Sequence, residues 1–157
     1  LAKVAGDGTQ VSGDRASKAL ALKRGIYANN AAVRAVVHTH STHLVALSLA
    51  GVWKPEDVVP PITPYYVMKV GHVPLIPYDR PGAPAVAEQV ADLAGKVRGV
   101  LLERLGPVVW HESVSSAAFA LEELEETAKL WLMLRDKTTP LSAAAIDDVR
   151  QAFKARW

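Results

Sequence analysis

Hydrophobic and polar residues follow two different periods along this chain, and each period predicts one kind of element. Apolar residues recur every three or four positions in residues 83–97 and 114–136, which is typical of helices that bury one face. Short apolar or β-branched runs predict strands over residues 33–39, 73–78, 99–103 and 107–110. Because such helices and strands alternate along the chain, the pattern predicts a layered α/β domain.

Capping and turn residues indicate where several elements begin and end. Ser113 is a suitable N-cap for the long helix, and Ser17 is one for a helix that runs to about residue 28. Gly51 is expected to end a short apolar helix over residues 42–50. Further helical segments are expected over residues 64–70 and 143–153, and a turn over residues 104–106. The long helix is expected to place most of its central acidic residues on the solvated side: Glu122, Glu123, Glu125 and Glu126.

The composition is that of a single folded domain spanning residues 1–157. Half of the 157 residues are hydrophobic and 22% are charged, which suffices for a continuous core. The net charge of +2 is small and the Lys and Arg residues are scattered along the chain, so no nucleic-acid partner is indicated. No apolar run approaches the roughly 20 residues that a membrane span needs. The absence of cysteine fits a cytoplasmic protein. Because the chain opens at Leu1 without a methionine, we expect the natural protein to extend further at its N-terminus.

Two histidines at the end of a predicted strand are the candidate chemistry. His38 and His40 are spaced i and i+2, and on a strand this spacing places both imidazoles on one face, within reach of one cation. Two neutral imidazoles make half of a tetrahedral zinc site. The alternative is a hydrogen-bonded histidine pair on a partly buried strand. His43 is a candidate further ligand, whereas the isolated His72 and His111 are expected to be surface or turn residues.

Four ordered blocks of the sequence resemble the class II aldolase/adducin family of metal-dependent sugar-phosphate enzymes. They are residues 36–43, 63–71, 100–107 and 120–129. The resemblance covers nearly all of the chain. Within the family, the segments around Tyr65, residues 73–82 and residues 121–129 look most like the 3-oxo-tetronate 4-phosphate decarboxylase branch.

This resemblance implies a three-layer α/β/α fold with a central, mainly antiparallel sheet, and a homotetramer with active sites at subunit contacts. It also implies a divalent metal, most often zinc, which His38 and His40 would hold and which would stabilise the enediolate left when a carbon–carbon bond breaks. Ser17 and Lys18 would bind the phosphate of a sugar-phosphate substrate at a helix N-terminus, and Tyr65 would contact that substrate. The alternatives are a plain N-cap with a solvated lysine and a packing tyrosine.

Three positions depart from the family pattern. Leu105 stands where the third metal histidine is found, and Ala19 stands where the acid/base glutamate is found. Lys23 stands where many family members have a histidine in the first helix. From its position in the helical pattern, Lys23 is expected to face water. Two functions therefore stay open. One is a metal-dependent lyase of reduced activity, which cleaves or decarboxylates phosphorylated keto sugars or keto-sugar acids. The alternative is a non-catalytic, adducin-like domain for oligomerisation or partner binding.

Overall fold

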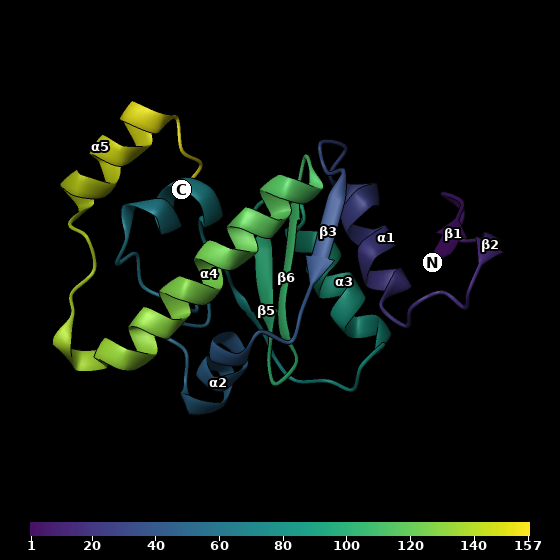
Figure 1. Ribbon diagram of the computed structural model, residues 1–157, viewed down its shortest axis with the longest axis horizontal. Helices are drawn as coiled ribbons and strands as arrows, with labels where there is room; N and C mark the ends of the chain where they lie inside the picture. Colours follow the sequence, from purple (N-terminus) through teal and green to yellow (C-terminus); the bar gives the residue numbers. More distant parts are fainter.

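A four-stranded sheet in the order β3-β6-β5-β4 lies at the centre of the molecule (Figure 1). The computed structural model describes residues 1–157, apart from the side chain of Asp136. The strands are β3 (Ala35–His38), β4 (Leu75–Ile76), β5 (Gly99–Leu102) and β6 (Gly106–His111). β6 pairs antiparallel with both β3 and β5, whereas β4 pairs parallel with β5. Two of the three pairings are antiparallel, so the sheet is mainly antiparallel, as expected.

Helices cover both faces of this sheet. One face packs against α1 (Leu20–Asn29) and α3 (Pro84–Leu93), which also contact each other. The other face packs against α2 (Thr42–Ala50), the long α4 (Val114–Leu134) and a π-helical turn, η1 (Tyr66–Val70). Figure 1 shows α4 crossing the sheet obliquely. The arrangement is the three-layer α/β/α fold that the sequence predicts.

The central strands are buried on both sides, which explains their continuous apolar sequence. Along β5 and β6, neighbouring side chains alternate between two hydrophobic clusters: Val100 and Val108 face one cluster, and Leu101 and Val109 face the other. A strand covered on one face only would alternate apolar and polar residues. The sheet is therefore the shared wall of two cores.

The remaining elements lie outside this three-layer body. A separate hairpin pairs β1 (Ala2–Val4) with β2 (Gln10–Gly13). A 3₁₀ turn, η2 (Arg135–Lys137), follows α4, and α5 (Ala143–Phe153) then returns to contact η1. None of the helices in the described chain is both long enough and apolar enough to cross a bilayer.

Most predicted bounds agree with the structure, and the differences have local causes. The strand predicted over 73–78 contains only Leu75 and Ile76, because the prolines on either side offer no N–H to a neighbouring strand. The first helix begins at Leu20, so Ser17 is not its N-cap. Instead the Ser17 hydroxyl accepts a hydrogen bond from the Ala19 N–H at 3.2 Å, in the turn that precedes the helix.

Candidate active site

A cleft of about 300 Å³ opens at the end of the sheet where β3 ends and β5 turns into β6. The N-terminal end of α1 forms one wall, and the loop before α3 forms another. Of the candidate residues, the cleft collects Ser17 and Lys18 from one wall, His38 from the end of β3 and His40 from the segment that follows it. The fold therefore brings together four of the five site residues that the sequence singles out.

His38 is held in a single orientation as the last residue of β3. Its Nδ1–H donates to the carbonyl oxygen of Pro107 at 2.8 Å, which leaves Nε2 with its lone pair available. Burial lowers the pKa of His38, and the Pro107 carbonyl opposes that shift. The neutral imidazole is thus favoured, which is the form that binds metal ions, and the bond to a backbone carbonyl is typical of ligating histidines.

His40 lies beyond the strand, not on it as the sequence predicts. β3 ends two residues earlier, at His38, and the first residue of β6 lies tightly against the next segment: a Cβ at Gly106 would stand 2.2 Å from the Thr39 carbonyl oxygen. The two rings still lie close, with centroids 5.3 Å apart and planes at 71°. His40 is exposed and lines the cleft, so the expected proximity of the two imidazoles is present without the expected strand geometry.

The positions that depart from the family pattern all line the same cleft. Leu105 and Ala19 offer it no donor atom. Within the described part of the chain, no group of three or more His, Cys, Asp or Glu side chains is arranged to hold a metal ion. His38 and His40 are therefore the nitrogen donors that the described residues bring to the cleft, which is half of a tetrahedral shell.

Positive charge dominates the polar lining of the cleft. Lys23 was expected to face water, but it is half-buried and lines the cleft. The pKa of His38 is lowered mainly by burial, then by the charge of His40, and then by the charge of Lys23. Arg80 also lines the cleft, as do Lys18 and Asp79. Arg80 could not be singled out from the sequence, apart from its place in the 73–82 segment that looks like the decarboxylase branch. Three cations against one carboxylate favour an anionic ligand.

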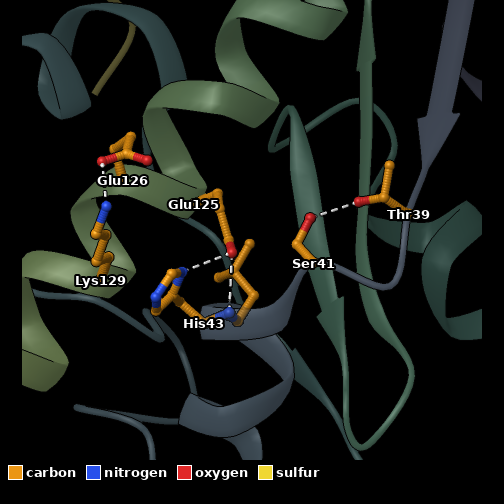
Figure 2. A network of polar contacts seen from close by, with 7 residues as sticks. Thr39, Ser41, His43, Glu125, Glu126 and Lys129 are labelled. Atoms are coloured by element: carbon orange, nitrogen blue, oxygen red, sulfur yellow. Dashed lines mark hydrogen bonds and ion pairs between the residues drawn. The ribbon is translucent and has the colours of Figure 1, made fainter.

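His43 is engaged in a structural contact and does not line the cleft. Its Nδ1 lies 2.9 Å from the Oε1 of Glu125, a residue of α4, and Figure 2 shows the two side chains pointing toward each other. The main-chain N–H of His43 also donates to Oε1 at 2.9 Å, and that of Leu44 donates to Oε2 at 3.0 Å. A carboxylate from α4 thus caps the N-terminus of α2, and His43 is not available as the further metal ligand considered above.

The acidic face of α4 is accordingly less solvated than expected. Glu125 is half-buried in this cap, and Glu123 is half-buried and accepts hydrogen bonds from Thr63 and Thr127 at 3.1 and 3.3 Å. Glu122 and Glu126 are exposed, as predicted. Residues at i and i+2 do not share a face of a helix, so the sequence pattern could not distinguish Glu123 and Glu125 from the exposed Glu122 and Glu126.

Tyr65 lies outside the cleft. It is 58% exposed and lines a different cavity, together with Phe119 and Phe153. Within one chain the structure does not bring Tyr65 to the histidines, so its role as a substrate contact stays a prediction.

Comparison with known proteins shows the family. Residues 1–132 match the family described as the Class II Aldolase and Adducin N-terminal domain. A 3-oxo-tetronate 4-phosphate decarboxylase from Cupriavidus necator is 68% identical over 162 residues, covering 100% of this chain and 75% of that protein. The protein of the same name from Escherichia coli K12 is 46% identical over 151 residues, covering 96% of this chain and 71% of that protein.

Solved structures agree with these sequence relationships. YgbL from Escherichia coli, described as an aldolase, epimerase or decarboxylase, superposes with a TM-score of 0.90 at 46% identity and covers 95% of this chain and 72% of that one. An L-fuculose 1-phosphate aldolase superposes with a TM-score of 0.83 at 21% identity, covering 98% of this chain and 71% of that one, which supports the fold. The named relatives are carbon–carbon lyases, so the enzymatic expectation is confirmed and the non-catalytic alternative is not favoured. The chain belongs to the class II aldolase and adducin N-terminal domain family.

Proposed function

We propose that this protein decarboxylates a phosphorylated 3-oxo sugar acid of the 3-oxo-tetronate 4-phosphate class. The observation that carries the proposal is the 68% identity, along the whole chain, to a decarboxylase of that name. The charges of the cleft support it independently. Such a substrate carries a phosphate and a carboxylate, and Lys18, Lys23 and Arg80 line a cleft of suitable size with only Asp79 as a described opposing carboxylate.

Ser17 and Lys18 are the proposed phosphate-binding residues. The Ser17 hydroxyl accepts from the Ala19 N–H, so its own O–H remains available to donate to a phosphate oxygen. Lys18 is exposed on the same wall and adds a cation. The turn that holds both residues stands directly before the N-terminus of α1, where the unpaired main-chain N–H groups favour an anion.

The residues present fit a divalent metal in part. His38 and His40 would hold it, and zinc suits their nitrogen donors best. When bound, the ion would supply Lewis-acid stabilisation of negative charge on the substrate. With Leu105 in place of a third ligand, we expect the ion to bind more weakly than it would at a site with three histidines.

Lys23 is the proposed electrostatic partner of the reacting group. When the bond to the carboxylate breaks, its electron pair moves onto the neighbouring ketone, carbon dioxide leaves and an enolate remains. Lys23 acts on His38 through its charge and lines the same cleft, so its ammonium group would favour that negative charge. The pattern of charges thus matches the step that decarboxylation requires.

The test is release of carbon dioxide from a phosphorylated 3-oxo-tetronate by the purified protein, with and without added zinc. Lys18→Ala should raise KM, because it weakens phosphate binding, and His40→Ala should weaken zinc binding measured by equilibrium dialysis, because it removes one of the two nitrogen donors. Lys54→Ala is the matched control, since Lys54 lies over the Trp53 ring and does not line the cleft. Turnover that is absent in the wild type, or unchanged by both cleft variants, would refute the proposal.

We further propose a cytoplasmic homotetramer in which Tyr65 serves the cleft of a neighbouring subunit, with no nucleic-acid or membrane partner. Exposed Tyr65, Phe119 and Phe153 line one cavity and offer an apolar surface for such a contact. Light scattering should give four chains per particle. Tyr65→Phe and His40→Ala proteins, inactive alone, should regain activity when mixed and reassembled, and failure of every mixture to do so would exclude a shared site.

A further inference from the structure

A second cavity, of about 470 Å³, lies at the end of the sheet opposite to the cleft. Its walls include the turn before β5, the end of β6 and the C-terminal residues 155–157. The β3–β6 register pairs Ala35 with His111 at this end and His38 with Val108 at the other. At about 3.3 Å per residue, roughly 10 Å of strand separates the two ends.

Four cationic side chains line this cavity: Lys96, Arg98, Arg150 and Arg156. Arg150 pairs with Asp147 at 3.1 Å. Among the side chains that the structure describes, neither Arg98 nor Arg156 forms an ion pair. Excess positive charge is therefore concentrated in a concave site of ligand size.

Arg98 and Arg156 line the same cavity, and their like charges disfavour each other. Burial lowers the pKa of Arg98, and the charge of Arg156 lowers it further. Glu112 lies near Arg98 and opposes this shift, but its carboxylate is hydrogen-bonded to His111. Glu112 is the acidic residue among the described side chains that line the cavity, against two guanidinium groups without an ion pair, and a bound anion would reduce the remaining repulsion.

Another part of the cavity wall, at His72, is held in place by a buried carboxylate. Asp57, which is 5% exposed, accepts from the Tyr66 hydroxyl at 2.8 Å and from the His72 Nδ1–H at 2.8 Å. The His72 ring lies against the Trp157 ring, with centroids 4.2 Å apart. Since Nδ1 is occupied, the Nε2 atom of His72 is left for another partner. The wall therefore has a fixed polar group beside an apolar ring.

We propose that this cavity is a second ligand site, which binds the phosphate of a small phosphomonoester through Arg98 and Arg156. A guanidinium group remains charged at any physiological pH and can donate two parallel hydrogen bonds to two phosphate oxygens. A lysine ammonium group lacks this planar, two-bond geometry. His72 and the Trp157 ring would contact the remainder of the ligand. The site is separate from the cleft and needs no metal.

Calorimetric titration with inorganic phosphate and with glycerol 3-phosphate tests the proposal. The Lys18→Ala protein is used throughout, so that phosphate binding in the cleft does not obscure the result. We expect one equivalent of each ligand per chain. Adding Arg98→Gln or Arg156→Gln should weaken binding by roughly tenfold or more, because each removes a charge-assisted hydrogen bond. Arg15→Gln, at an exposed arginine outside the cavity, should change nothing.

Thermal unfolding keeps the test independent of folding defects. Either ligand should raise the Tm of the Lys18→Ala protein but leave that of the Arg98→Gln variant unmoved. Without ligand, Arg98→Gln should be at least as stable, since it removes the repulsion from Arg156. The proposal would be overturned if phosphate still binds when Arg98 and Arg156 are both replaced by Gln, or if phosphate does not bind to the Lys18→Ala protein in which both arginines are present. Binding of inorganic phosphate without glycerol 3-phosphate would overturn the phosphomonoester assignment.

Discussion

Removing the Glu125 carboxylate should destabilise the protein by freeing the N-terminus of α2. The perturbation is Glu125→Ala, in a side chain that is 20% exposed and accepts three hydrogen bonds from two consecutive residues. Two of the donors are main-chain N–H groups of the first turn of α2, which otherwise lack a partner. The third is the imidazole of His43.

The magnitude follows from these contacts. Loss of an N-cap costs about 0.5–2 kcal/mol, and the partly exposed imidazole–carboxylate pair adds about 0.2–1 kcal/mol. Leu44 is fully buried, so its N–H has no easy access to water and the capping loss should fall in the upper half of its range. We therefore expect the free energy of unfolding to fall by roughly 1.5–3 kcal/mol.

Urea denaturation measures this change, with Glu126→Ala as the matched control on the next residue of α4. Glu126 is 58% exposed and pairs only with Lys129, at 3.6 Å (Figure 2), so its loss should cost less than about 0.5 kcal/mol. His43→Ala should account for the imidazole share alone. Equal losses in the Glu125 and Glu126 variants would refute the cap as a source of stability.

Three further outcomes are expected. Gly106→Ala should lower the free energy of unfolding by at least about 2 kcal/mol in urea denaturation, because the residue has φ +121° and its Cβ would meet the Thr39 carbonyl. Gly51→Ala should lower it less, because Gly51 also has a positive φ but nothing lies within 4 Å of its Cβ position. Leu105→His should tighten zinc binding roughly tenfold or more in equilibrium dialysis by adding a third nitrogen ligand, and unchanged affinity would contradict the site. Burial raises the pKa of Tyr66, so as pH rises the phenol loses its proton in the unfolded protein before it does so in the folded protein. The free energy of unfolding, measured by urea denaturation, should therefore fall as pH rises above about 10, and it should fall less steeply with pH in Tyr66→Phe.

Much of the architecture could be predicted because local chemistry and tertiary packing agree along most of the chain. The bounds of α2 and α5 match the expected 42–50 and 143–153, since Gly51 and Phe153 stand where the apolar pattern ends. The two-sided burial of β5 is visible as an uninterrupted apolar run. The hairpin of β1 and β2 gave little signal, because its residues are almost all exposed and carry no apolar alternation.

The site was less accessible to prediction because it depends on contacts between distant segments. The His38 imidazole is oriented by the carbonyl of Pro107, and no local pattern connects these residues. Lys23 and Glu125 look like solvated helix positions, yet tertiary packing directs one to the cleft and the other to the end of α2. Sequence spacing places side chains relative to their own element, but not relative to another element.

The alanine at position 19 bears on which lyase reaction this chain can support. Aldol cleavage needs a base to take the hydroxyl proton before the carbon–carbon bond breaks, and loss of such a base typically costs about 10²–10⁴-fold in rate. A 3-oxo acid loses carbon dioxide without that step, since its carboxylate is already ionised. It requires only stabilisation of the enolate, for which Lys23 and the two imidazoles line the cleft, and a later proton that water can provide. The residues that remain in the cleft therefore favour decarboxylation over aldol cleavage.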